Sequence, residues 1–142
     1  MTCIDASLAG KWLFPEEYSA NALALARMAR ASGESLIGPP HLRAEVSNII
    51  RRRMRREALS LDRARGRFRR FQTFPVVTRE VQGLYDAAIL FSHQYHLPAA
   101  YDAVYVALAA LLGDELWTDD RRLLRGLRGK LSFVRWIGDY PS

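Results

Sequence analysis

The chain has 142 residues, the size of one ordinary domain, and its 49% hydrophobic content excludes a disordered protein. No apolar run reaches the roughly 18 residues of a membrane-spanning helix. The first residues lack the basic segment of a signal peptide, and the single cysteine, Cys3, cannot form an internal disulfide. We therefore expect a single domain over residues 1–142, in the cytoplasm and not in a membrane.

Positive charge is concentrated in one part of the chain. The formal net charge is +6 and the isoelectric point is about 10.0. Ten arginines lie between Arg51 and Arg70 against only two acids, so this segment carries +8 and the rest of the chain carries −2. Such a segment is typical of proteins that bind a polyanion. The alternatives are a solvated helix face or a surface for an acidic protein.

The hydrophobic pattern predicts short strands that alternate with helices. We expect strands at 2–5, 35–38, 74–77, 115–118 and 131–137, and a loop at 93–98. Helices are expected at 8–13, at 16–31 with Glu16 and Glu17 in its first turn, from Pro39 into the arginine run, at 59–71, at 100–112 and around 123–127. A further helix should be capped by Thr78 and carry Val81, Leu84, Tyr85, Ala88 and Ile89 on one face. This order predicts an α/β fold in which helices cover both faces of a mostly parallel sheet of about five strands.

Acids stand where two of the predicted strands end. Asp5 ends the first strand, and Asp119 and Asp120 follow the strand at 115–118. The carboxyl ends of parallel strands share one edge of the sheet, where ligands bind. Asp102 begins a helix that returns toward the amino end of a strand, so it starts at the same edge. We therefore expect these acids to lie near one another.

Glu45 is a further candidate for this group. It lies three residues after Leu42, beside the apolar stripe of its helix, so its carboxylate needs a partner, either an arginine or a metal ion. Taken singly, Asp102 and Asp120 could be acids that cap or stabilise a helix N-terminus. Asp5 is harder to explain as a cap alone, because it directly follows an apolar strand.

Four carboxylates without a matching histidine or cysteine cluster suit Mg²⁺ or Mn²⁺ better than zinc. The chemistry of such a site is hydrolysis of a phosphodiester by metal-activated water, without a covalent intermediate. The basic segment would then hold a polyanionic substrate. His93 and His96 are spaced like metal ligands, but they precede Pro98 in an expected loop and we predict no zinc site there. No glycine-rich phosphate loop is present, and no nucleophile elbow surrounds Ser7.

Four sequence motifs follow one another in a characteristic order and spacing. They are IDAS followed by KWLFPEE (4–7 and 11–17), PHLRAEVSNII (40–50), YDAVYVALA (101–109) and WTDDRRL (117–123). Together they resemble the PIN-domain ribonucleases, specifically the VapC-type toxins of bacterial toxin–antitoxin pairs. The resemblance covers almost the whole chain.

The resemblance implies a three-layer α/β/α sandwich and Mg²⁺- or Mn²⁺-dependent endoribonuclease activity on RNA. It also implies inhibition by a cognate antitoxin protein and a homodimer. The family's catalytic and metal-binding acids fall on Asp5, Glu45, Asp102 and Asp120. The last acid belongs to a Thr-x-Asp pattern, so Asp119 takes the variable position. Residues expected beside the metal ligands are Ser7, Thr118 and Asp119. The arginines expected to bind RNA are Arg51, Arg52, Arg53, Arg55 and Arg56.

Two other functions are compatible with parts of this pattern. One is a non-catalytic basic module that binds nucleic acid or protein, in which the acids are caps and ion-pair partners. The other is a receiver-like phosphoacceptor domain, which needs an acidic pair after the first strand and a lysine near the end of a late one. Here a single acid follows the first strand, and Lys11 and Lys130 are the only lysines.

Overall fold

The computed structural model describes all residues, 1–142, as strands and helices in alternation. The strands are β1 (Thr2–Ile4), β2 (Leu36–Gly38), β3 (Val76–Thr78), β4 (Glu115–Thr118) and β5 (Val134–Trp136). The helices are α1 (Ala6–Leu13), α2 (Ser19–Ser32), α3 (Leu42–Glu57), α4 (Leu61–Phe71), α5 (Leu84–Gln94), α6 (Ala100–Leu112) and α7 (Arg121–Leu127), followed by a 3₁₀ turn at Ile137–Asp139. No helix is both long and apolar enough to cross a membrane.

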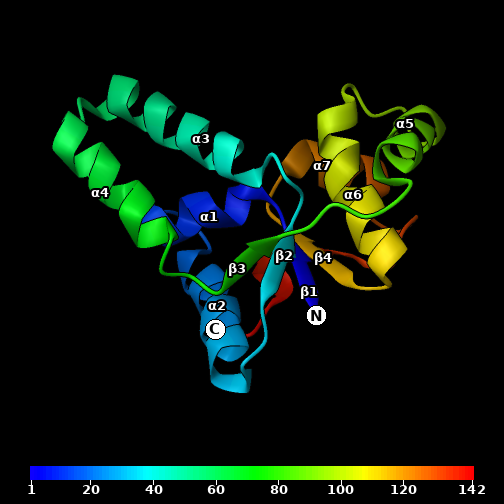
Figure 1. Cartoon of the computed structure of the whole chain (residues 1–142), viewed down its shortest axis with the longest axis horizontal. Helices are drawn as coiled ribbons and strands as arrows, with labels where there is room; N and C mark the ends of the chain where they lie inside the picture. Colours follow the sequence, from blue (N-terminus) through cyan, green and yellow to red (C-terminus); the bar gives the residue numbers. More distant parts are fainter.

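The five strands form one sheet in the order β3-β2-β1-β4-β5, and every neighbouring pair is parallel. The chain moves from β1 outward to β3 through α1–α4, and then returns across the sheet through α5–α7. Right-handed crossovers therefore place α1–α4 on one face and α5–α7 on the other. Figure 1 shows these two helical layers on either side of the sheet. The predicted three-layer α/β/α sandwich is confirmed.

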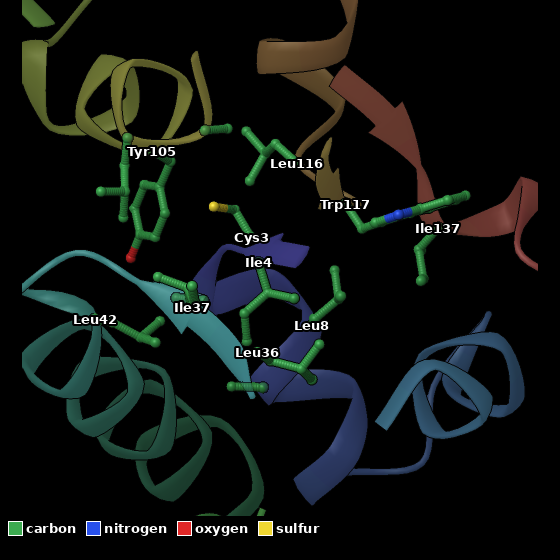
Figure 2. Packing of buried hydrophobic residues seen from close by; sticks show 14 of the residues in the cluster. Cys3, Ile4, Leu8, Leu36, Ile37, Leu42, Tyr105, Leu116, Trp117 and Ile137 are labelled. Atoms are coloured by element: carbon green, nitrogen blue, oxygen red, sulfur yellow. The ribbon is translucent and has the colours of Figure 1, made fainter. Parts of the chain in front are cut away.

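The core lies on both faces of β1, the central strand. Cys3 and Ile4 are adjacent in β1, so their side chains point to opposite faces. In Figure 2, Cys3 points toward Leu116 and the α6 layer, while Ile4 points toward Leu8 of α1. All four residues are at most 1% exposed. In α6 every residue from Ala103 to Ala109 is buried, which explains the nearly continuous apolar sequence of this helix.

The expected start of α2 was wrong. The helix begins at Ser19, because Tyr18 adopts a left-handed conformation (φ 64°) and interrupts the helical path. Glu16 and Glu17 therefore precede the helix. The backbone N–H of Glu16 donates to the hydroxyl of Ser19 (3.0 Å), and the Glu16 carboxylate pairs with Lys11 (3.3 Å). Glu16 therefore stabilises the α1–α2 turn, and neither acid lies in the first turn of α2.

The helix expected after Thr78 was also displaced. Thr78 is the last residue of β3, and α5 starts only at Leu84, after Gly83 in a left-handed conformation (φ 81°). Leu84 and Ala88 are buried, but Tyr85 and Ile89 are exposed, so the five predicted residues do not share one buried face. The α5 helix also runs through His93 to Gln94, where we expected a loop.

The β2–α3 connection is tight because Gly38 has no side chain. A Cβ atom at this position would lie 2.4 Å from Cδ2 of Leu42. Pro39, Pro40 and His41 complete the turn, and α3 begins at Leu42, slightly later than expected. Leu42 itself is fully buried. This close packing fixes the first turns of α3 against the carboxyl edge of the sheet.

Candidate active site

A pocket of about 560 Å³ lies at the carboxyl edge of the sheet. Its walls come from the β1–α1 junction, the first three turns of α3, the start of α6 and the start of α7. All four acids predicted from the sequence line it, namely Asp5, Glu45, Asp102 and Asp120. Four segments that are far apart in the chain therefore bring their carboxylates to one opening, as the parallel topology requires.

Asp5 is the most deeply buried of the four acids, with 5% of its surface exposed. It caps α1 by accepting the backbone N–H of Ser7 (3.1 Å), and it also accepts hydrogen bonds from the hydroxyls of Ser7 and Thr118. Burial raises the pKa of Asp5 to about 7, helped by the charge of Asp120 and opposed by these hydrogen bonds. Its orientation is fixed, while its negative charge is poorly compensated.

Asp120 is both a helix cap and a wall of the pocket. Its Oδ1 accepts the backbone N–H groups of Arg122 (3.0 Å) and Leu123 (3.1 Å) at the start of α7. Its own N–H donates to Thr118 Oγ1 (2.9 Å), whose hydroxyl in turn donates to Asp5. One threonine thus connects Asp5 and Asp120. The capping function and the pocket position, which the sequence left as alternatives, occur together.

Asp102 lies in the first turn of α6 and is half-buried. No hydrogen bond is among the interactions that shift the pKa of its carboxylate. Burial raises its pKa, and the nearby charges of Asp120 and Glu45 raise it further. The charges of Arg122 and His41 lower this pKa to a smaller extent, so the negative charges around Asp102 are only partly balanced.

Glu45 has a partner that the sequence did not predict. Its Oε1 lies 3.0 Å from Nε2 of His41, one helical turn earlier, where we expected an arginine or a metal ion. Tyr105 lies beside this pair, with the His41 and Tyr105 ring centroids 5.1 Å apart. The Tyr105 hydroxyl is buried without a hydrogen bond, and burial together with the charges of Glu45, Asp5 and Asp102 raises its pKa.

Asp119 points away from the pocket. Its carboxylate accepts from Lys11 (2.8 Å), from Arg121 (3.1 Å) and from the indole N–H of Trp136 (2.7 Å). Burial acts to raise its pKa, but the hydrogen bonds of Lys11 and Trp136 and the two positive charges lower it overall. Its backbone N–H donates to Ser7 Oγ (2.9 Å). Asp119 therefore anchors the β4–α7 junction from behind and leaves Asp120 facing the pocket.

The α3 arginines differ in their surroundings. Arg52 lines the acidic pocket and also a neighbouring hollow of about 640 Å³ formed with Ile49, Arg53, Arg55 and Arg56. Arg51, Arg52, Arg55 and Arg56 are exposed. Arg53 instead pairs with Glu16 and Glu57, and its guanidinium lies over the ring of Phe14 (4.7 Å). In Figure 1, α3 and α4 form a helical hairpin that extends away from the sheet.

A family profile described as the PIN domain matches residues 2–127 of the chain. The protein belongs to the PIN domain family. Its structure also resembles the crystal structure of PAE2754 from Pyrobaculum aerophilum, with a TM-score of 0.65 over 96% of this chain and 90% of that one. The two sequences are 19% identical, so this likeness concerns the fold. No curated protein matches the chain.

PIN domains are generally metal-dependent nucleases, and they bind nucleic acid and often pair with antitoxins. The acidic pocket is the part of this PIN domain that suits such chemistry. Membership of the family also excludes the receiver-like alternative, which is a different doubly wound fold. Membership of the family thus supports the predicted fold and the prediction of a nuclease that uses a divalent metal ion.

The donor set of this PIN domain fits a hard divalent cation. Its carboxylates supply oxygen ligands. The pKa values of Asp5 and Asp102 are raised because their charged forms are disfavoured in the pocket, and a bound cation would stabilise those charged forms. No three histidine, cysteine, aspartate or glutamate side chains are close enough to form a metal site alone. Mg²⁺ commonly binds one or two carboxylates and takes its other ligands from water and substrate phosphates. An open, partly assembled carboxylate site therefore suits it.

Several pocket residues of the PIN domain were missed by the sequence analysis. His41, Asn48, Tyr101 and Tyr105 all line the pocket. A signal was present, because His41, Glu45, Asn48 and Arg52 follow one another at spacings of four, three and four residues. Such spacings place side chains on one face of a helix. Starting from Glu45, this periodicity could have identified the polar face of α3.

Proposed function

We propose that this PIN domain is a metal-dependent endoribonuclease and the toxin of a toxin–antitoxin pair. The observation that carries the nuclease proposal is the carboxylate of Asp102, whose pKa is raised by burial, Asp120 and Glu45 more than Arg122 and His41 lower it. A half-buried carboxylate in such surroundings is unfavourable unless a cation joins it. RNA as the substrate and the toxin function are supported by the sequence resemblance to VapC-type toxins.

In this proposal Asp5, Glu45, Asp102 and Asp120 would hold Mg²⁺ or Mn²⁺ together with water and substrate phosphates, since no three of the side chains form a metal site alone. When bound, the ion supplies positive charge that polarises the scissile phosphate and lowers the pKa of an attacking water. The protein contributes fixed ligand orientations. Ser7 and Thr118 hold Asp5, and the first N–H groups of α7 hold one oxygen of Asp120, which leaves its other oxygen for the ion. Preorganised ligands of this kind need little rearrangement when substrate binds.

The α3 arginines would bind the RNA backbone next to the metal ligands. Arg52 borders both the acidic pocket and the basic hollow, so a strand in the hollow would lead directly to the carboxylates. Arg51, Arg55 and Arg56 extend the same exposed face of α3. Binding through these side chains would weaken as salt increases, because each phosphate contact releases counterions.

Replacing Asp102 by asparagine tests the nuclease proposal. The change keeps the shape of the side chain but removes its charge, so we expect Mg²⁺- or Mn²⁺-dependent cleavage of labelled RNA to fall at least about 100-fold while the fold is unchanged. Asp86→Asn is a matched control, because Asp86 is an exposed acid at the same position in the first turn of α5. It should cleave like the wild type.

A fully active Asp102→Asn protein would refute the proposal. Calorimetric titration of the protein with Mn²⁺, in the absence of RNA, distinguishes the nuclease from the non-catalytic alternative. A nuclease should bind Mn²⁺, and Asp5→Asn should weaken that binding. A basic binding module whose acids are only caps would show no Mn²⁺ binding that depends on Asp5.

The toxin proposal has its own tests. Expression of the protein in a bacterial host should arrest growth, and Asp102→Asn should relieve the arrest. A short reading frame directly upstream, encoding a DNA-binding antitoxin, would support the assignment, and its product should inhibit RNA cleavage when mixed with the protein. Growth that is unaffected by active protein would refute the toxin function and leave the nuclease proposal standing.

A further inference from the structure

A second basic region lies at the end of the chain. Residues 121–138 contain six basic side chains and no acid, at Arg121, Arg122, Arg125, Arg128, Lys130 and Arg135. Together with the segment from Arg51 to Arg70, this region leaves a charge of −8 on the remainder of the protein. The net charge of +6 therefore comes from two basic regions, and the second one belongs to α7 and β5.

Part of this region forms a small pocket of its own. Its volume is about 250 Å³, and it is lined by Arg121, Leu124, Arg125, Arg128 and Trp136. The guanidinium groups of Arg121 and Arg128 lie over the Trp136 ring, 5.0 and 5.6 Å from its centroid. Stacking on an indole holds arginines in place and keeps N–H donors at the guanidinium edges available. We call this the arginine–tryptophan pocket.

Trp136 is held firmly, so the pocket is a defined structure. Its indole N–H donates to Asp119 (2.7 Å), and the Tyr18 ring packs edge-on against it (4.9 Å between centroids). Gly138 makes room for the ring, because a Cβ atom there would lie 2.4 Å from Cζ2 of Trp136. Arg125 has no ion-pair partner in the protein, while exposed Arg128 pairs with Asp139 at 3.3 Å.

The arginine–tryptophan pocket adjoins the acidic pocket but shares no residue with it. Asp120 and Leu123 face the acidic pocket, whereas Arg121, Leu124, Arg125 and Arg128 of the same helix line the other. The α7 helix therefore separates the two pockets. The hollow formed by the α3 arginines is entered from the acidic pocket through Arg52, on a different helix. Basic surface thus borders the acids on both α3 and α7.

We propose that the arginine–tryptophan pocket binds a backbone phosphate of the RNA strand as it leaves the acidic pocket. Four carboxylates repel a polyanion, so the phosphates on each side of the cleaved bond need positive charge. The α3 arginines supply it on one side, and Arg125 and Arg128 supply it on the other. Guanidinium groups also match phosphate geometry, since they can donate two hydrogen bonds at once. The proposal rests on the proposed nuclease function.

The test measures RNA binding in the Asp102→Asn background, without divalent ions, so that no cleavage occurs. A fluorescent single-stranded homopolymeric RNA is titrated at several salt concentrations. Changing both Arg125 and Arg128 to alanine should weaken binding and lower the slope of log affinity against log salt by about 0.7, the value for one lost phosphate contact on a single strand. The control is Arg27→Ala, an exposed arginine on α2, which should leave the slope unchanged.

Two further variants make the result decisive. Arg128→Lys keeps the charge but loses the stacked guanidinium, so it should weaken binding while keeping most of the slope. Thermal unfolding should show that the double variant is folded, because both side chains are exposed. A folded double variant with the wild-type slope would overturn the proposal. If that variant had also lost the binding of poly-glutamate that the wild type shows, the pocket would be a surface for an acidic protein instead.

The result also separates this inference from the proposed function. If the wild type cleaves RNA and the slope of the double variant is unchanged, only the arginine–tryptophan pocket is refuted. If the slope falls but the wild type cleaves no RNA with any divalent ion, the pocket binds RNA and the nuclease proposal is refuted.

Discussion

At the scale of single residues, hydroxyl groups determine how the acids are presented. Thr118 donates to Asp5 and accepts the backbone N–H of Asp120, and Ser7 donates to Asp5 and accepts the backbone N–H of Asp119. Two hydroxyls thereby join β1 to the β4–α7 junction. Their geometry explains why Asp120 faces the pocket while Asp119, one residue earlier, faces away from it.

Asp5 should make the stability of the metal-free protein depend on pH. Its pKa is about 7 in the folded protein, against an ordinary value of 3.8 when unfolded, so the folded state binds this proton more tightly. Its contribution to stability is complete below about pH 4 and is lost as the pH rises to 7, on the order of 4 kcal/mol at most. In EDTA, Asp5→Asn should therefore gain stability relative to the wild type between pH 5 and pH 8, measured by urea unfolding.

Asp119→Asn is the control of opposite sign. The pKa of Asp119 is lowered in the folded protein, so its carboxylate stabilises the fold at neutral pH and this stability is lost as the pH falls through the folded pKa. Asp119→Asn should therefore be less stable than the wild type at neutral pH. If the wild-type and Asp5→Asn stability curves ran parallel from pH 5 to pH 8, the raised pKa of Asp5 would be refuted.

At the scale of elements, the first turn of α3 packs against the sheet edge, while its polar face lines the acidic pocket. Its first turn packs on Gly38, and its last turns carry the arginines. The arginines themselves divide in two groups. Arg53 joins α3 to the α1–α2 turn through Glu16 and Phe14, whereas Arg55 and Arg56 are exposed. Neighbouring arginines in the sequence should therefore have different functions.

Two variants of α3 test this division. Arg53→Ala removes two ion pairs and a cation–π contact around a side chain that is 16% exposed, so it should lower the free energy of unfolding by about 1–2 kcal/mol. Arg55→Ala combined with Arg56→Ala should leave stability nearly unchanged but weaken RNA binding and lower its salt dependence. Urea unfolding and RNA titration measure the two effects. An Arg53→Ala protein of wild-type stability would contradict this division of functions.

At the scale of the whole molecule, three exposed apolar side chains lie together on α5, namely Tyr85, Ile89 and Leu90. Ile89 is 63% exposed, Leu90 57% and Tyr85 50%, and Tyr85 and Ile89 are one helical turn apart. Their exposure explains why the predicted buried face of this helix was wrong. Apolar residues exposed together commonly mark a protein–protein contact. We propose that the homodimer expected from the resemblance to VapC-type toxins forms through this surface.

Ile89→Arg tests the homodimer. The charge would be buried without a partner in the interface, so the variant should be monomeric at concentrations where the wild type is a dimer, as measured by light scattering. Met28→Arg is the control, because Met28 is 60% exposed on α2, which belongs to the other helical layer. A wild type that is monomeric at all concentrations, or an Ile89→Arg protein that remains dimeric, would refute this dimer surface.

The sequence by itself determined the order of elements, the three layers and the carboxyl edge at which the acids meet. It could do so because strand and helix periodicities are local, and because parallel topology places every strand's carboxyl end on one side. Element boundaries near Glu16 and Thr78 were wrong because they depend on single backbone conformations at Tyr18 and Gly83.

Only the tertiary structure decided which groups face each other. Asp119 points outward because Lys11, Arg121 and Trp136 bind it from three different elements. The arginine–tryptophan pocket likewise needs α7 and β5 side by side. Such contacts join residues that are distant in sequence or set by an irregular turn, so periodicity carries no signal for them.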